Sequence, residues 1–375
     1  MNCDSIVVLD QAAGQKQLAI LEAFKNKYKY RSIIAGTINE RKLKLENDIV
    51  WEKTIPYNRS NIIIRTLSWV IFTIQSFIIV KRKYKNSDLF IITNPPLSIF
   101  LPFFLNNTFD VLVFDLYPDA LSEYKYISKS SLIYRLWEKW NIKIYKKARR
   151  VFTLSQGMAD KLSFYVDYNK IEVVPLWTDN SFLQPIPKSE NTFVKDHGLE
   201  KKFTIMYSGN MGLTHPVELL HDLAEMLKDD QDILFLLIGG GHKYKLLEQK
   251  IKTSNLTNIF ILPWQTPDRL PLSMNAADVG VVTLDAEASK LSVPSKIFDL
   301  FSIGIPILGI GSKDSELSKL LLNYDSGICF NNNQMSEMVN YILKLKNDSP
   351  YYNLISKNSL NSSTFHTPLN ANKFI

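Results

Sequence analysis

Three side chains near the start of one predicted helix have the types and spacing of an anion site. The stretch VPSKIFDLFSIGIPILG, residues 293–309, opens with Pro-Ser-Lys and ends with Gly304 and a proline. This pattern predicts a helix that Ser295 caps at its start and Gly304 ends. The first turn of a helix offers unpaired backbone N–H groups and a positive dipole, and Lys296 would add an ammonium there. We expect a phosphate group to bind at this point.

Asp299 extends the same site by one turn. It lies three residues after Lys296, so both side chains project from one face of the helix. The carboxylate could accept hydrogen bonds from two ribose hydroxyls while the helix start binds a diphosphate. The spacing therefore fits a nucleoside diphosphate. The alternative for these two residues is a surface ion pair.

Three loops that follow predicted strands could complete such a site. YSGNMG contains Gly209 and Gly212, IGGG contains Gly240, and LPWQ contains Trp264 and Gln265. Small residues let the backbone approach a ligand closely, and Trp264 could contact a base or pack on a neighbouring helix. In doubly wound sheets, ligands bind at the carboxyl ends of the strands, which is where these loops lie.

The elements that position these loops are read from apolar runs separated by helix-length segments. Such runs are typical of parallel strands buried on both faces, and they predict an α/β protein. The runs are SIVVLD, YRSIIAGTI, DLFIITNPP, DVLVFDLYPD, RRVFTLS and KIEVVPLW, followed by FTIMYSGN, ILFLLIGGG, NIFILPWQ, VGVVTLD, IPILGIG and SGICF. IGGG does not bind a dinucleotide by the G-x-G-x-x-G pattern, because Tyr244 stands where the third glycine is required.

The length of 375 residues predicts two domains. Prolines and polar residues near residue 184 mark a linker. We expect an N-terminal domain at 1–183, a C-terminal domain at 184–350, and a final segment, 351–375, that could pack back on the N-terminal domain.

Charge is distributed unevenly between the halves. Residues 1–180 contain 26 Lys and Arg against 17 Asp and Glu, whereas residues 181–375 contain 18 against 20. This asymmetry suggests an anionic partner for the first half, and a membrane surface is favoured over nucleic acid because no nucleic-acid-binding signature is present. The two cysteines, Cys3 and Cys329, form no metal or disulfide pattern, which favours a reducing cytoplasm, and the N-terminus predicts a strand instead of a signal peptide.

The longest apolar stretch is residues 62–80, followed by the basic segment KRKYK. Three alternatives remain open for it. It could be a core helix, a helix lying on a membrane surface with its basic end toward anionic headgroups, or a membrane span.

Taken together, these motifs resemble the retaining family 4 of glycosyltransferases with the GT-B fold, in which two doubly wound parallel-sheet domains face a cleft. The resemblance rests on YSGNMG, IGGG, NIFILPWQTPDRLPLSMNAADVGVVTLD and VPSKIFDLFSIGIPILG, in that order. It covers residues 203–330 well and reaches back to about residue 148 through RRVFTLSQGMADKL and IEVVPLWTDNSF. The N-terminal part is similar in layout.

The resemblance implies roles for several acids. Asp299 takes the place of the second acid of the family's E-x7-E motif, which binds the ribose. The first acid would fall at Leu291, which cannot serve, so Asp285 or Glu287 could replace it. Asp115 matches the acid of a His-Asp pair near the reacting sugar, although a turn role is a close alternative.

The resemblance also implies the donor site. Ser295 and Lys296 would hold the diphosphate, as in relatives with a P-S-K before this helix, and Lys296 and Asp115 would be the catalytic residues. The expected donor-binding residues are Gly14, Gly209, Asn210, Gly212, His215, Gly240, Trp264, Gln265, Glu287, Ser295, Lys296 and Asp299.

The implied reaction transfers a sugar, with retention, from a nucleotide-sugar to an acceptor hydroxyl. UDP-sugar is the preferred donor, no other cofactor is expected, and no metal, because the D-x-D at Asp230 and Asp232 precedes a predicted strand. The expected acceptor is a membrane-associated saccharide, plausibly linked to a lipid diphosphate, used in surface polysaccharide biosynthesis at the inner face of the cell membrane. The alternatives are a transferase acting on a soluble acceptor, a sugar-nucleotide epimerase and a non-catalytic partner subunit.

Overall fold

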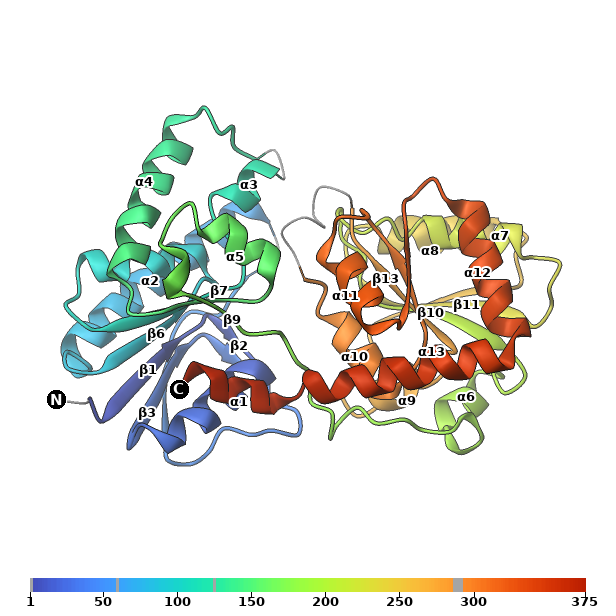
Figure 1. Ribbon diagram of the computed structural model, residues 1–375, viewed down its shortest axis with the longest axis horizontal. Coiled ribbons are helices and arrows are strands. Elements are labelled where there is room, and N and C mark those ends of the chain that lie inside the picture. Colours follow the sequence, from blue (N-terminus) through green and yellow to red (C-terminus); the bar gives the residue numbers. More distant parts are fainter. Residues whose placement is uncertain (1–2, 59–60, 124–125, 286–292) are drawn as a thin grey trace. The chain divides into compact units, whose positions relative to one another are not determined.

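The chain folds into two compact α/β units (Figure 1). The computed structural model describes residues 3–58, 61–123, 126–285 and 293–375. The first unit comprises Met1–Leu176 and Pro368–Ile375, and the second comprises Trp177–Thr367. The division after Leu176 lies before the expected boundary at residue 184. Of the expected final segment 351–375, the residues from Pro368 onward belong to the first unit.

The first unit is built on a parallel seven-stranded sheet in the order β5-β3-β1-β6-β7-β8-β9. Its strands are β1 (Ser5–Leu9), β3 (Tyr30–Ala35), β5 (Ile49–Lys53), β6 (Asp88–Ile92), β7 (Phe109–Val113), β8 (Val151–Thr153) and β9 (Ile171–Val173), and a small pair is formed by β2 (Ala12–Ala13) and β4 (Thr37–Ile38). Its helices are α1 (Gln15–Ala23), α2 (Ile62–Lys83), α3 (Asp119–Glu123), α4 (Leu132–Lys147), α5 (Gln156–Leu162) and the 3-10 helices η1 (Phe24–Asn26), η2 (Pro96–Phe103), η3 (Tyr168–Lys170) and η7 (Pro368–Phe374).

The second unit has a parallel six-stranded sheet in the order β12-β11-β10-β13-β14-β15. Its strands are β10 (Phe203–Asn210), β11 (Ile233–Gly240), β12 (Ile259–Leu262), β13 (Val279–Thr283), β14 (Ile307–Ile310) and β15 (Gly327–Phe330). Its helices are α6 (Thr192–Asp196), α7 (Leu219–Met226), α8 (Tyr244–Thr253), α9 (Leu270–Met274), α10 (Lys296–Ile303), α11 (Glu316–Tyr324), α12 (Met335–Asn347), α13 (Ser349–Ser362) and the 3-10 helices η4 (Lys188–Glu190) and η6 (Ser363–Phe365).

The predicted parallel strands are confirmed in both sheets. Central strands such as β6 and β13 are buried along their whole length, which explains their continuous apolar sequences. The sequence did not predict β5. Only Ile49 of its five residues is buried, and the strand ends in Glu52 and Lys53, as suits an edge strand.

Helix α10 begins and ends close to where the sequence predicts. Gly304 ends it in the left-handed conformation, with φ of 69°, as expected for a terminal glycine. The predicted cap at Ser295 is wrong: the residue already has helical backbone angles, φ −59° and ψ −20°, and its side chain makes no capping hydrogen bond. A capping side chain requires an extended backbone, which Ser295 does not adopt.

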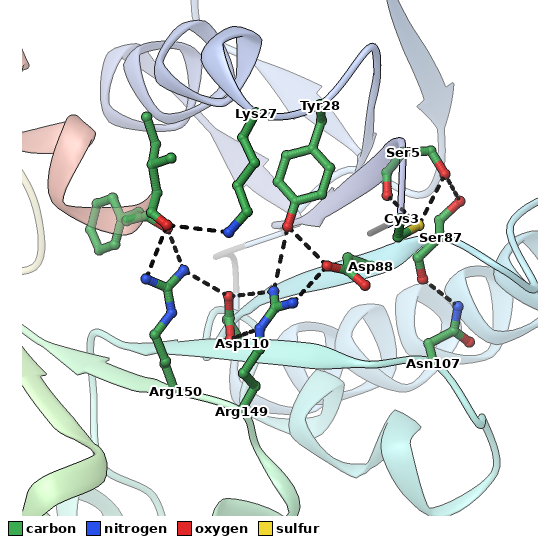
Figure 2. Close-up of polar contacts among 12 residues, drawn as sticks. Cys3, Ser5, Lys27, Tyr28, Ser87, Asp88, Asn107, Asp110, Arg149 and Arg150 are labelled. Atoms are coloured by element: carbon green, nitrogen blue, oxygen red, sulfur yellow. Dashed lines mark hydrogen bonds and ion pairs between the residues drawn. The ribbon is translucent and has the colours of Figure 1, made fainter. Parts of the chain in front are cut away.

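Two arginines and two buried aspartates tie together the amino ends of the strands in the first unit (Figure 2). Arg149 donates to both oxygens of Asp110, at 2.9 and 2.8 Å, and to Asp88 at 2.8 Å. Arg150 donates to Asp110 at 3.1 Å and to the main-chain oxygen of Phe374 at 2.6 Å. These arginines therefore connect β6 and β7 with the returning segment η7.

Candidate functional site

The strand order of the second sheet reverses beside β10. Its order places the first strand of the unit, β10, between β11 on one side and β13 on the other. At such a switch point the loops leave in opposite directions, and open α/β sheets bind ligands in the resulting crevice at the carboxyl ends of the strands. Gly209 and Asn210 end β10, Thr283 ends β13, and α10 follows β13 in the chain.

Lys296, the first residue of α10, lies against the end of β10. Its Nζ donates to the hydroxyl of Tyr207 at 2.8 Å and lies 4.0 Å from the centre of that ring. Tyr207 in turn donates to the main-chain oxygen of Asn210 at 2.6 Å. Burial lowers the pKa of Lys296 to about 7, against an opposing effect of the Asp299 charge. Because a buried ammonium gains most from an anionic partner, this site favours binding of an anion.

Gly209 leaves the space that the lysine occupies. A Cβ atom on this residue would lie 2.0 Å from the Nζ of Lys296, and φ is 151°, a conformation that residues with a side chain rarely adopt. Position 209 of the YSGNMG loop therefore needs a glycine to leave room for the side chain of Lys296.

Replacing Gly209 with alanine is expected to displace the ammonium and weaken binding of a nucleoside diphosphate such as UDP by about 10- to 100-fold, the loss of one charged hydrogen bond. Isothermal titration calorimetry would measure the change. Gly198→Ala is the matched control, because Gly198 also has positive φ, 65°, but a Cβ there meets no atom within 4 Å. Equal affinities in the two variants would contradict this role of Gly209.

His215 lies beside the same loop. Its Nδ1 contacts the carbonyl oxygen of Thr283 at 2.7 Å, so Nδ1 carries the proton. Burial lowers its pKa, the Thr283 hydrogen bond raises it, and the charges of Lys296 and Lys243 lower it further. The neutral ring presents Nε2 as an acceptor at neutral pH.

The other glycine loops bring further predicted residues together. A Cβ on Gly240 would lie 2.6 Å from Nε1 of Trp264, so the indole covers this glycine. A Cβ on Gly212 would lie 2.9 Å from Nδ2 of Asn210. Because Trp264 remains largely exposed, its ring can still receive a stacked group.

Three predicted residues of this unit stand apart from these contacts. Asp299 accepts a hydrogen bond of 2.6 Å from the hydroxyl of Thr178, so part of its carboxylate is already engaged. Ser295 is exposed at the start of α10. The side chain of Gln265 donates to its neighbour Pro263 at 3.0 Å. Glu287 lies outside the described residues.

The two predicted residues of the first unit lie in loops at the carboxyl end of its own sheet. Asp115 follows β7 with an exposed side chain, and its main-chain oxygen accepts from Thr93 Oγ1 at 3.1 Å. Gly14 precedes α1, and its N–H donates to Gln17 at 3.0 Å. A polar cavity of about 440 Å³ lies at the opposite, amino end of that sheet, where Tyr28, Asp88 and Arg149 line it.

Sequence reasoning missed two residues that contact the predicted ones. Tyr207 holds Lys296, and Thr178 holds Asp299. Tyr207 lies within an apolar strand, where an aromatic residue reads as core, and Thr178 is 121 positions from its partner. Tyr207 and Gly209 are two positions apart in one strand, so they lie on the same face of the sheet. Only this spacing could have indicated the contact between Tyr207 and Lys296.

Among the described residues, no group of three or more His, Cys, Asp or Glu side chains could hold a metal ion. The D-x-D acids precede β11 at its amino end, and Asp230 is paired with Lys346 at 2.6 Å.

The chain is similar to known proteins in sequence and in fold. Residues 189–362 match the family described as glycosyl transferases group 1. The structure superposes on Anabaena Alr3699/HepE, solved in complex with UDP, with a TM-score of 0.72 and 13% identity over 99% of this chain and 98% of that one. It also superposes on WaaG, a glycosyltransferase involved in lipopolysaccharide biosynthesis, with a TM-score of 0.70 and 12% identity over 99% of each chain.

The chain has the GT-B fold. In sequence it is similar to "Probable glycosyltransferase WbjE" of Pseudomonas aeruginosa, 24% identical over 239 residues. That match covers 61% of this chain and 58% of WbjE, so the chain spans little more than half the length of this relative. The family match falls within the second unit, and Gly209, His215 and Lys296 lie among the matched residues.

Proposed function

We propose that this GT-B protein is a retaining glycosyltransferase of family 4 that transfers a sugar from a UDP-sugar to a hydroxyl of a saccharide acceptor. The observation that carries the proposal is the position of Lys296, whose half-buried ammonium lies at the start of α10 and at the switch point of the second sheet. HepE, which shares the fold, was solved with UDP and with UDP-glucose, and this supports UDP as the nucleotide.

In the proposed reaction the bond between the anomeric carbon and the diphosphate oxygen breaks. A bond from that carbon to the acceptor oxygen forms on the same face, and the acceptor proton passes to the departing phosphate. Charge develops on the diphosphate, so Lys296 and the first turn of α10 stabilise the transition state more than the ground state. Asp115 would orient a substrate hydroxyl, and the chemistry requires no metal.

The expected donor-binding residues are assigned to different parts of the UDP-sugar. Lys296 and Ser295 hold the diphosphate, the carboxylate of Asp299 accepts from the ribose, and Trp264 with Gln265 face the base. The backbone of the YSGNMG and IGGG loops, with Asn210 and His215, lies along the phosphates and the sugar. Gly14 and Glu287 complete the donor contacts.

The acceptor is proposed to be a membrane-associated saccharide, linked to a lipid diphosphate, in surface polysaccharide biosynthesis. The name of WaaG, involved in lipopolysaccharide biosynthesis, supports this class. The protein would then act in the cytoplasm, bound peripherally to the inner face of the membrane.

A thermal-shift screen with UDP, GDP, ADP, TDP and NAD tests the donor. A ligand present at about 100 times its Kd stabilises the native state by about 2.7 kcal/mol. We expect UDP to raise the Tm most, and Asp299→Ala to remove the shift because the ribose loses its acceptor. A larger shift with another nucleotide would reassign the donor, and no shift with any of them would favour a non-catalytic partner subunit.

A further inference from the structure

Helix α2 (Ile62–Lys83) exposes many apolar side chains and fixes its other face to the unit by both packing and hydrogen bonds. Its buried residues are Trp69, Phe72 and Val80 together with Ser68 and Ser76. The half-buried Gln75 accepts from the N–H of Ile55 at 2.9 Å. The main-chain oxygen of Ser68 accepts from Gln11 at 3.0 Å. Polar groups thus fix this helix to the unit.

The outward face of α2 is apolar from Ile62 to Ile78, before the basic last turn of the helix. The exposed side chains recur every three or four residues and therefore form one stripe. They are Ile63, Leu67, Val70, Ile74 and Ile78, with Ile62, Ile64 and Ile71 at its border. Ile63 is 69% exposed. Among the described helices, α2 is the one whose length and composition would suffice to cross a membrane, and 22% of its apolar window is buried.

Aromatic residues of η2 (Pro96–Phe103) extend the stripe toward α4 (Leu132–Lys147). Phe104, 72% exposed, packs against Phe77 of α2 with ring centres 6.2 Å apart. Phe100 packs against the half-exposed Trp140 of α4 at 5.5 Å. The start of α4 then adds three exposed residues, Leu132, Ile133 and Leu136. We call α2, η2 with Phe104, and α4 the apolar face.

Cations accompany this apolar face almost without acids. Residues 62–85 contain five Lys and Arg and no acid, and residues 132–147 contain five Lys and Arg with one acid, Glu138. Lys83 pairs with Glu52 of β5 at 2.8 Å. Since an exposed apolar area and a surplus of Lys and Arg both favour an anionic bilayer surface, the two observations indicate the same partner.

We propose that the apolar face docks on a lipid bilayer that carries anionic headgroups, with α2 and α4 lying in the interface. The helix α2 does not span the bilayer, because its other face is fixed to the unit by the hydrogen bonds of Ser68 and Gln75. A second copy of the chain would bring two clusters of like charge together, which disfavours self-association. The inference rests on the proposed function in one respect, since a lipid-linked acceptor is met at this surface.

Sedimentation with vesicles tests the docking. We expect the full chain to pellet with vesicles of phosphatidylglycerol and phosphatidylcholine at about 0.1 M salt, and to bind at least tenfold less at about 1 M, where the Debye length falls from about 10 to about 3 Å. Vesicles of phosphatidylcholine alone should also bind at least tenfold less. Lys139→Gln and Lys143→Gln should each reduce binding about fivefold, the equivalent of about 1 kcal/mol per lysine.

The apolar contribution is tested with Leu67→Gln combined with Ile74→Gln, which should reduce binding at least tenfold. Both side chains are exposed, so folding should be unaffected. The control is Leu246→Gln with Leu322→Gln, two leucines of the second unit that are even more exposed, which should bind like the wild type.

Several results would overturn the proposal. One is that the protein does not sediment with either kind of vesicle, and another is that the control pair loses as much vesicle binding as the test pair. A third is that the protein stays in the pellet at both salt concentrations after alkaline carbonate extraction, which would indicate a membrane span. A dimer that Leu67→Gln with Ile74→Gln dissociates, without vesicle binding, would assign the face to a second copy. The UDP thermal shift of the same samples separates the two proposals, because it reports on the second unit irrespective of lipid.

Discussion

Replacing Lys296 with methionine is expected to lower kcat/KM for the UDP-sugar by about 10²- to 10³-fold, the effect of removing one positioned donor from a site where charge develops. Methionine keeps most of the length and the apolar stem of lysine, so the packing against Tyr207 should survive. Steady-state kinetics of sugar transfer or of donor hydrolysis would measure the change. A Tm of the free variant equal to or above that of the wild type would show that the loss is not one of folding.

The same lysine should make donor binding depend on pH. With a pKa of about 7 in the free protein, Lys296 is charged below pH 7, and UDP binding is then at full strength. Above pH 7 the neutral amine must take up a proton to pair with the diphosphate, so the affinity should fall by up to about tenfold per pH unit. The affinity for UDP stops falling once the pH exceeds the higher pKa that Lys296 has in the complex with UDP.

Isothermal titration calorimetry between pH 6 and pH 9, in buffers of different ionisation enthalpy, would detect this proton uptake. In Lys296→Met, the decrease in UDP affinity above pH 7 and the proton uptake on binding should both disappear. His215 also faces the site, but its lowered pKa means that it titrates below neutrality and does not contribute above pH 7. Binding by the wild type that does not change from pH 7 to pH 9 would contradict the assignment of Lys296 to the diphosphate.

Replacing Phe374 with alanine is expected to reduce the free energy of unfolding of the first unit by about 3–5 kcal/mol, as for other buried aromatic residues. Its ring is fully buried, with centres 5.3 Å from Phe90 of β6 and 4.9 Å from Phe152 of β8. The returning segment therefore supplies part of the core of this unit. Denaturation by urea, followed by circular dichroism, would measure the loss.

Phe365→Ala is the matched control for Phe374→Ala. Phe365 lies nine positions earlier and is 62% exposed, so its removal should cost about 1 kcal/mol or less. Because the two units can unfold in separate transitions, the first unit should show the larger change in Phe374→Ala. Equal losses in both variants would show that Phe374 is not part of the core.

The strands and the position of α10 could be predicted because their signals are local. A buried parallel strand must be apolar throughout, and Gly304 permits the left-handed turn that ends α10. The edge strand β5 lacks such a signal, because its five residues, IVWEK, combine a short apolar run with two charged residues and only Ile49 is buried. Residues 62–80 allowed three interpretations, since hydropathy does not tell which face of a helix is covered.

The candidate site was predictable in its residue types more than in its contacts. Lys296 and Gly209 were both expected at the site, and the structure adds that one occupies the space left by the other. The partners Tyr207 and Thr178 depend on which strands and segments become neighbours, and sequence spacing carries no record of that. The cap at Ser295 failed because residue preference does not fix the backbone angles.

The return of residues 368–375 to the first unit has a consequence for how this chain can be recombined. A chimaera that replaces everything after Leu176 with the corresponding part of another protein would also remove Phe374 and the oxygen atoms that bind Arg150. The first unit would then keep its whole sheet and lose part of its core. Exchange of the second unit therefore requires two junctions, one after Leu176 and one before Pro368, so that the first unit keeps its own C-terminal residues.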